Sequence, residues 1–220
     1  MTADITVLQQ TYNGQLKELY KVTGDDCGGT SVNDRLCKML EEIIWGNMTT
    51  ESNRKEPIDW FNMLQEFSRA IERITTSNRK LITLKYPWSL NEICEELHGN
   101  DLKSAIDSSS YVNKITLCGD KLRFDVDLII KLVTPTIDSF ITLMKNTISN
   151  RSTNGLSNII MIGEFSKCPM IQEAVYKAFS DNQIIIPDYP DLSVLKGAVI
   201  FGHRPDYNRS ELCDEEGIGK

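Results

Sequence analysis

The chain has 220 residues, with 24 Lys and Arg against 31 Asp and Glu, a formal net charge of −7 and an apolar fraction of 40%. This composition suits a globular chain with one sizeable core, and the acidic balance argues against binding to nucleic-acid phosphates, which requires a basic face. No apolar stretch approaches the roughly 20 residues that cross a bilayer, and no secretory signal is visible. We therefore expect a cytoplasmic protein that binds neither nucleic acid nor membranes.

The cysteines and histidines give no sign of a metal site. The six cysteines lie far apart, without the close pairs that zinc sites use, and neither of the two histidines has a Cys or carboxylate at ligand spacing. In a chain of this length without a secretion signal, free buried thiols are favoured over a disulfide framework. No catalytic triad is apparent either, so we assign no catalytic residue.

The first part of the chain combines hairpins with helices. Asn13-Gly14 separates two apolar runs, which predicts antiparallel strands joined by a two-residue turn. Ser89 with Glu92 three residues later predicts a capping box at the start of a helix. The apolar spacing predicts these elements in chain order: strands at 5–8 and 16–20, helices over 32–44 and 58–75, a strand at 81–84, a helix over 90–97, and a hairpin of 112–117 with 121–124.

The second part alternates helices with strands. A long helical pattern begins at residue 125, and Pro135 should kink or split that helix because its ring removes a backbone donor. The continuous apolar runs at 158–163 and 183–187 are typical of strands buried on both faces. Helices are expected after Pro169 and over 192–201. The hairpin at the start should share one mixed sheet with these strands, covered by helices.

Two glycine turns stand where a ligand could bind. Gly28-Gly29 precedes a helix, whose N-terminal amides and dipole favour an anion such as phosphate. Gly163 ends a predicted strand and precedes a helix, which is where open α/β sheets bind their ligands. Each turn taken alone also fits an ordinary tight turn.

Several segments taken together resemble one protein family. They are 4–7, 16–21 before Gly28-Gly29, 159–179 with Gly163, and 191–202, which contains Leu-Lys-Gly-Ala-Val. In this order they resemble the ATPase domain of the 70-kDa heat-shock proteins, in the actin-like superfamily, and most of all its divergent twelve-A and twelve-B branch. The resemblance covers about residues 2–202.

The resemblance implies an α/β fold, the C-terminal lobe (lobe II) of an actin-like, ribonuclease H-like ATPase domain. In that reading 1–30 and 125–202 form the sheet-and-helix core, 31–124 form an inserted α+β subdomain, and 203–220 form a polar acidic tail. The first lobe, with its own phosphate hairpin, has no counterpart in this sequence. It would be the partner that completes an ATP-binding cleft.

The resemblance also assigns nucleotide contacts to individual residues. Thr2 matches the Thr of the second phosphate motif, and Gly28-Gly29 matches a phosphate turn. Gly163 matches the first of two glycines near the nucleoside, whereas Glu164 replaces the second and adds negative charge. Lys167 stands where the family has an Arg near the adenine.

One family motif near the adenine is not preserved. Its Glu-x-x-Lys-Arg residues fall on Ser68, Ile71 and Glu72, none of which matches, and a shifted register offers Glu66 and Arg69 as partial substitutes.

Two functions remain open from the sequence. The first is an ATP- or ADP-binding lobe of a heat-shock-70-like chaperone ATPase of the stress response, with magnesium bound in the complete protein and no hydrolysis by this chain alone. The second is a scaffold or interaction module that keeps the fold without nucleotide. Candidate partners are the first lobe, a nucleotide exchange factor and client proteins.

Overall fold

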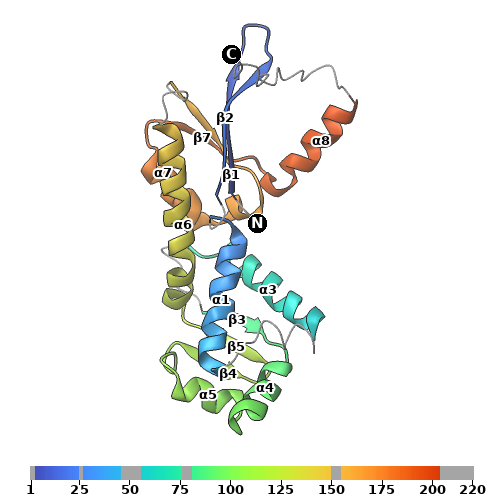
Figure 1. The fold of residues 1–220 in the computed structure, drawn as a ribbon, viewed down its shortest axis with the longest axis vertical. Coiled ribbons are helices and arrows are strands. Elements are labelled where there is room, and N and C mark those ends of the chain that lie inside the picture. The colour runs from blue at the N-terminus through green and yellow to red at the C-terminus, as the bar shows by residue number, and fades with distance from the viewer. Residues whose placement is uncertain (1–2, 25–26, 46–55, 76–80, 150–154, 204–220) are drawn as a thin grey trace, which may run out of the picture.

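The structure, a computed structural model, describes residues 3–24, 27–45, 56–75, 81–149 and 155–203. Thr2 and almost all of the tail expected at 203–220 lie outside these residues. Figure 1 shows an elongated molecule whose two ends are connected by two long helices. The fold is a mixture of helices and small sheets, in agreement with the predicted α/β class.

The chain begins with the predicted hairpin. Strands β1 (Ala3–Gln10) and β2 (Leu16–Gly24) pair antiparallel, with a register shift between Val7 and Leu8. In Figure 1 this hairpin projects from one end of the molecule. The strand prediction is therefore confirmed, with strands longer than expected.

The turn of this hairpin differs from the prediction. The Thr11 amide donates to the Gln15 carbonyl at 2.8 Å, and the Gly14 amide donates to the Thr11 carbonyl at 2.9 Å, which leaves a three-residue loop. Gly14 has φ 76°, whereas Asn13 does not adopt a positive φ. A three-residue loop needs only one left-handed residue, so the Asn-Gly pair serves here in a different turn from the two-residue type.

The middle of the chain forms helices and a small antiparallel sheet. Its strands run in the spatial order β3-β5-β4. The elements are α1 (Gly29–Ile44), α3 (Pro57–Ile71), β3 (Ile82–Lys85), α4 (Ser89–His98), α5 (Leu102–Ser108), β4 (Ile115–Cys118) and β5 (Lys121–Phe124). The second hairpin is confirmed, although its first strand begins at Ile115 rather than at 112.

The capping box predicted at Ser89 is wrong. The N-cap of α4 is Trp88, which makes no side-chain cap bond, and Ser89 is already the first residue of the helix. The Ser89 amide donates instead to Glu56 Oε2 at 2.8 Å, and the Ser89 hydroxyl is buried without a hydrogen-bond partner. A carboxylate from a distant segment therefore replaces the local cap.

Helix α6 (Val126–Ile148) connects the two ends of the molecule. Its N-cap is Asp125, whose Oδ1 accepts from the Asp127 amide at 2.7 Å. Pro135 lies inside the helix, which continues through it rather than splitting. At the next residue, the Thr136 hydroxyl accepts a hydrogen bond from the Arg35 guanidinium of α1, which ties the two long helices together.

The last part of the chain returns to the end where the hairpin lies. Strands β6 and β7 pair parallel, with Ile159 opposite Ile184. The elements are β6 (Asn158–Ile160), the short 3-10 helix η2 (Glu164–Lys167), α7 (Pro169–Ala178), β7 (Gln183–Ile185), the 3-10 helix η3 (Pro190–Leu192) and α8 (Ser193–His203).

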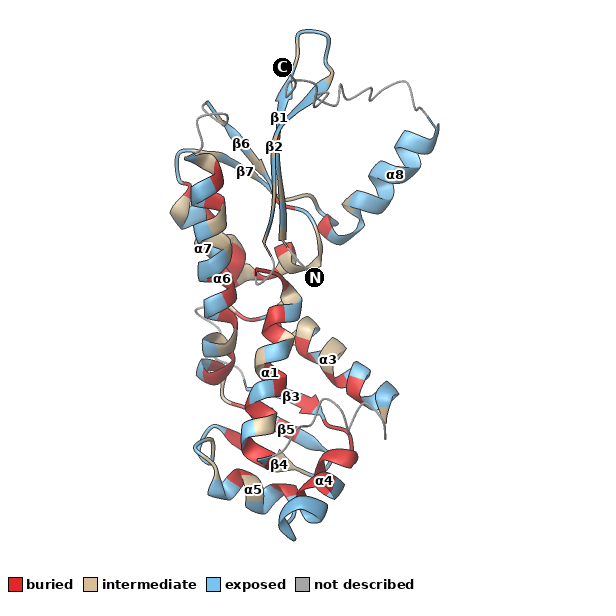
Figure 2. Ribbon diagram, in the orientation of Figure 1, coloured by how far each residue is buried: buried red, intermediate tan, exposed pale blue. Residues whose placement is uncertain are grey.

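Two predictions about this end are wrong. The hairpin does not share a mixed sheet with the later strands, because β1–β2 and β6–β7 are separate two-stranded sheets within the described residues. The later strands are also not buried on both faces, since Ile160 is 63% and Ile162 48% exposed. Ile159 and Ile184 of these strands pack against the hydrophobic core, which also contains residues of α6 and α7, and in Figure 2 the helix α8 stands apart from the strands.

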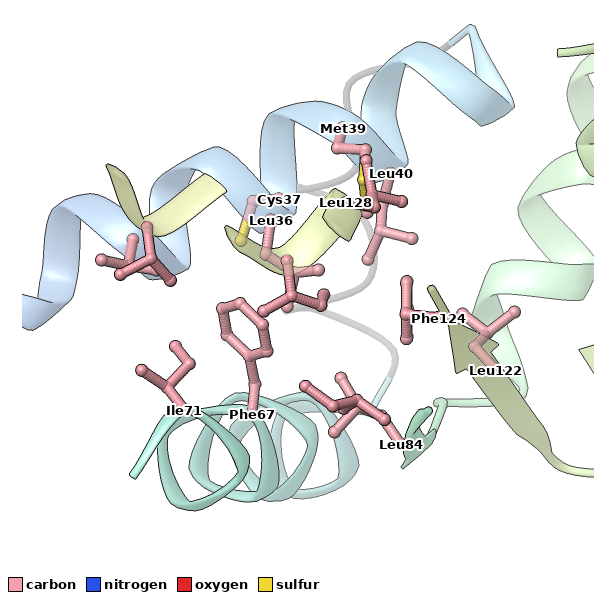
Figure 3. Packing of buried hydrophobic residues seen from close by; sticks show 14 of the residues in the cluster. Leu36, Cys37, Met39, Leu40, Phe67, Ile71, Leu84, Leu122, Phe124 and Leu128 are labelled. Carbon is pink, nitrogen blue, oxygen red and sulfur yellow. The ribbon is translucent and has the colours of Figure 1, made fainter. Parts of the chain in front are cut away.

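The densest packing lies between α1, α3 and the three-stranded sheet. In Figure 3, Phe67 of α3 points toward Leu36 of α1, with Leu84 and Phe124 of the sheet close by. Phe67, Phe124 and Leu36 have no exposed surface, and Leu84 is 1% exposed. Burying such side chains contributes about 1.5–3 kcal/mol each, so this cluster stabilises the end of the molecule that carries the small sheet.

Removing the central aromatic ring of the cluster should be costly. Phe67→Ala deletes a fully buried ring, so we expect it to lower the free energy of unfolding by about 3–5 kcal/mol in urea titrations. Phe61→Ala on the same helix is the matched control, because Phe61 is 59% exposed. Equal losses for the two variants would contradict the packing described.

A second prediction concerns the cap of α5. Asp101 Oδ1 accepts from the Ser104 amide at 2.8 Å, and this hydrogen bonding to Ser104 lowers the pKa of Asp101. A carboxyl with a lowered folded-state pKa stabilises above its unfolded-state pKa, and that contribution disappears as the pH falls through the folded value. Asp101→Ala should therefore lower the urea midpoint at neutral pH and have a shrinking effect in acid. Asp107→Ala, exposed on the same helix, is the control, and a pH-independent loss at Asp101 would contradict the assignment.

Candidate functional site

The first predicted glycine turn forms the start of α1. Gly28 is the N-cap, with φ −107° and ψ 173°, and the Ser31 amide donates to its carbonyl at 3.1 Å. Because glycine has no side chain, the start of α1 has no side-chain cap. The amides of a helix N-terminus and the helix dipole together favour an anion beside this turn.

The second predicted turn follows β6. Gly163 has φ 93° and ψ 165°, a conformation that is essentially restricted to glycine. Its amide donates to the Pro190 carbonyl at 2.7 Å, and its carbonyl accepts from the Ser166 amide at 3.2 Å. The Ser166 hydroxyl donates back to the Ile162 carbonyl at 2.7 Å. The backbone of this turn is therefore held on both sides.

Both turns line one cavity of about 260 Å³. Gly28 and Gly29 reach it from α1, and Gly163 and Glu164 reach it from the end of β6. The turns come close to each other, since a Cβ built on Gly29 would lie 4.0 Å from Phe165 Cδ2. The rest of the lining is largely hydrophobic and includes Ile5 and Val7 of β1, Phe140 and Met144 of α6, and Ile159 and Met161 at β6.

This arrangement can hold a ligand with two kinds of chemistry. An apolar or aromatic ring fits the hydrophobic lining, and an anionic group fits the N-terminus of α1. The Glu164 carboxylate lies in the same lining and opposes an anion on its side of the cavity. The geometry therefore favours an anionic group at Gly28-Gly29 over one at Gly163-Glu164.

Lys167 is not among the residues that line this cavity. Its Nζ lies 2.6 Å from Asp191 Oδ2 of η3, with the two side chains about one-third exposed. The hydrogen bond to Asp191 raises the pKa of Lys167, and the charges of Glu72 and Glu164 act in the same direction. Asp191 was missed as a functional partner, because 24 residues separate it from Lys167 and no local pattern indicates their contact.

Ser68 and Glu72, the two positions assigned from the unmatched adenine motif, also lie outside the cavity lining. Both are partly buried at the end of α3, where the Glu72 amide donates to the Ser68 carbonyl. The Glu72 charge raises the pKa of both Lys167 and Cys168, which places this carboxylate on their side of the molecule. Glu72 therefore lies close enough to act on Lys167, but it does not line the cavity that the glycine turns share.

The shifted register considered for the same motif leads to a different place. Glu66 and Arg69 line a second cavity of about 300 Å³ between α3 and β3. Glu66 Oε2 accepts from the Lys85 amide at 3.1 Å, so this carboxylate is used at the edge of the small sheet. These two residues do not line the glycine cavity.

The five cysteines in the described residues agree with the prediction of thiols rather than a disulfide framework. None of these five forms a disulfide: Cys27, Cys37, Cys94 and Cys168 are buried, Cys118 is partly buried, and Cys213 lies outside the described residues. Burial raises the pKa of Cys37 and Cys94 to about 11, so both stay protonated thiols at neutral pH.

The described residues contain neither a cluster of metal-ligand side chains nor a membrane-spanning helix. Among the residues described, no three His, Cys, Asp or Glu side chains gather as metal ligands would. None of the helices in this part of the chain has the length and apolar character needed to cross a bilayer.

The comparisons with known proteins point to one group of relatives. The chain is 29% identical over 206 residues to Heat shock 70 kDa protein 12A of Homo sapiens and of Mus musculus, and 25% identical over 208 residues to Heat shock 70 kDa protein 12B of Homo sapiens. Each match covers 93% of this chain. No protein-family model matches the chain.

The matches cover only part of the relatives. The chain spans 30% of the length of each of these proteins. This agrees with a resemblance to one lobe of a larger protein. The resemblance inferred from the sequence is confirmed: over nearly all of its length, the chain is similar to the twelve-A and twelve-B branch of the 70-kDa heat-shock proteins.

Proposed function

We propose that this chain forms one wall of an ATP- or ADP-binding cleft in a heat-shock-70-like ATPase. The observation that carries the proposal is the meeting of Gly28-Gly29 and Gly163-Glu164 at a single cavity, although more than 130 residues separate them in sequence. The resemblance assigns phosphate contact to the first pair and nucleoside contact to the second.

Each turn would make a different contribution to binding. The α1 N-terminus would attract the phosphates, since its amides and dipole favour negative charge. Gly163 would let the backbone approach the nucleoside, because it has no side chain and its φ of 93° excludes most replacements. The hydrophobic lining from β1, α6 and β6 would receive the apolar face of a ring.

We expect binding by this chain alone to be weak. Glu164 adds negative charge to the lining, and Lys167 is engaged by Asp191. Each charge-assisted contact that is lost costs about 1.5–3 kcal/mol, or roughly one to two decades of affinity. In this proposal the first lobe supplies the opposite wall, magnesium binds in the complete protein, and the chain alone does not hydrolyse ATP.

The proposal extends to the role of the complete protein. We infer a chaperone-type ATPase of the stress response in the cytoplasm, with a nucleotide exchange factor or client proteins as partners. In the family, exchange factors grip the part that matches residues 31–124. That segment contains the densely packed cluster around Phe67.

A second candidate is a scaffold that keeps the fold without binding nucleotide. The Lys167–Asp191 ion pair favours it, since the one lysine assigned to the adenine already has a carboxylate partner. The positions of Ser68 and Glu72 outside the cavity lining point in the same direction. The two candidates differ in whether ADP binds at the α1 N-terminus at all.

Charge at the first glycine turn provides the test. Gly28→Asp should weaken binding of magnesium–ADP by at least about tenfold, because a carboxylate beside the phosphates costs about 1.4 kcal/mol or more. The fold should tolerate the change, since the φ of −107° suits any residue and Asp is a preferred N-cap. Isothermal titration at millimolar ADP measures the affinity, and thermal unfolding checks the fold.

Gly28→Asn is the matched control, because Asn caps a helix as well as Asp does but carries no charge. It should retain most of the affinity. Equal affinity of the Asp and Asn variants would contradict phosphate contact at this turn. Absence of any binding heat for the unsubstituted chain would favour the scaffold.

A further inference from the structure

Glu164 lines the glycine cavity, and its carboxylate has no hydrogen-bond or ion-pair partner among the described residues. The other acidic residue in the lining is Asp4, whose Oδ1 accepts from the Thr23 hydroxyl at 2.7 Å. Lys167 is near enough for the Glu164 charge to act on it, but its ammonium group bonds Asp191 at 2.6 Å. Glu164 is therefore a half-buried acceptor that the described part of the protein does not use.

Two hydroxyl groups of the cavity lining donate their protons to backbone groups instead. Ser166 Oγ donates to the Ile162 carbonyl at 2.7 Å, and Thr147 Oγ1 donates to the Leu143 carbonyl at 2.9 Å. A carboxylate in a largely hydrophobic lining is costly unless hydrogen-bond donors reach it. We therefore expect donors on the ligand that enters the cavity.

Glu164 lies beside the turn to which the proposed function assigns the phosphates. A Cβ built on Gly29 would lie 4.0 Å from Cδ2 of Phe165, and Phe165 directly follows Glu164. In a nucleoside diphosphate the group joined to the phosphates is the ribose, whose 2′- and 3′-hydroxyls are two adjacent donors. The amino group of adenine lies at the far side of the base. The ribose is therefore the part of the ligand that brings donors to this position.

Carboxylates are well suited to bind a ribose. An ionised carboxylate accepts hydrogen bonds at both oxygens, and such charge-assisted bonds are stronger than neutral ones. In folds that bind NAD, an acidic residue accepts from the ribose 2′-hydroxyl in this way. The free carboxylate of Glu164 and the donor pair of a ribose are therefore complementary.

We propose that Glu164 binds the ribose hydroxyls and thereby selects ribonucleotides over 2′-deoxyribonucleotides, an inference that rests on the proposed nucleotide site. A 2′-deoxynucleotide lacks one donor, so the carboxylate still repels its phosphates but receives fewer hydrogen bonds that offset this repulsion. The replacement of the family glycine by Glu164 then changes which nucleotides bind, in addition to weakening the binding of phosphates.

Titration of the full 220-residue chain with ADP and with 2′-deoxy-ADP, each with magnesium, tests the ribose contact. The amide chemical shifts of residues 163–166 report both affinities. We expect 2′-deoxy-ADP to bind at least about tenfold more weakly, because it loses one charge-assisted hydrogen bond. Magnesium on the phosphates contributes equally to the two ligands, so the ratio of the affinities isolates the hydroxyl.

Glu164→Ala should remove this preference for ADP. The variant should also bind 2′-deoxy-ADP more tightly than the unsubstituted chain does, because no carboxylate then repels the phosphates. Asp188→Ala is the matched control, since it removes an exposed carboxylate outside the cavity lining, and it should keep the preference. Glu164→Gln retains the size of the side chain and should reduce the preference, because its hydrogen bonds are neutral.

The outcomes separate the ribose contact from the nucleotide site itself. Equal affinities of the unsubstituted chain for the two nucleotides would overturn the ribose contact and leave the proposed nucleotide site in place. An unchanged preference for ADP in both Glu164 variants would also overturn it, because another group would then bind the hydroxyl. Absence of binding by either nucleotide would overturn the ribose contact together with the proposed function.

Discussion

The hydrogen bond from the Gly163 amide to the Pro190 carbonyl is the contact on which this end of the molecule depends. It forms because Gly163 adopts a φ of 93°, which turns the chain sharply after β6. The turn brings η2 beside η3, where Lys167 and Asp191 form their ion pair. The same turn places Gly163 and Glu164 in the cavity and fixes the base of α8. A single glycine conformation thus positions both the candidate site and the helix beside it.

The two ends of the molecule differ in how completely they bury their hydrophobic residues. Around Phe67, side chains from two helices and a sheet exclude water on all sides. Around β6–β7, Ile159 and Ile184 pack against the core, whereas Ile160, Ile162 and Ile185 stay partly or largely exposed. Exposed apolar surface of this kind marks a place where another element or protein packs. The cavity lies at this less covered end, where a ligand has hydrophobic surface to gain.

The sequence predicted helices and strands well where the spacing of nearby apolar residues defines the buried face. The helical spacing of apolar residues around Leu36 and around Phe67 indicates a buried helix face, and these segments form α1 and α3. The glycine turns were also predictable, since each stands at the junction of two elements. The meeting of Gly28-Gly29 with Gly163 followed only from the family resemblance, because no spacing connects segments so far apart.

Most of what the sequence predicted wrongly or missed depended on distant partners. The hydrogen bond from the Ser89 amide to Glu56 replaces the local cap that was expected. The ion pair between Lys167 and Asp191 could not be predicted, because 24 residues separate the two in the sequence. The apolar run at 158–163 predicted two covered faces, whereas only one is covered. Hydrophobic content alone does not say which element covers a strand. Asn13-Gly14 fits both two- and three-residue loops, so its turn could not be chosen from the residues.

The most direct test of a shared nucleotide site is a map of amide chemical shifts as magnesium–ADP is added to the chain. A common cavity predicts that shifts cluster at both turns, at Gly29 and nearby α1 amides and at Gly163 through Ser166. The remote cluster around Phe67 should be unaffected. Shifts confined to other surfaces, or no shifts at millimolar ADP, would contradict a nucleotide wall built from these two glycine turns.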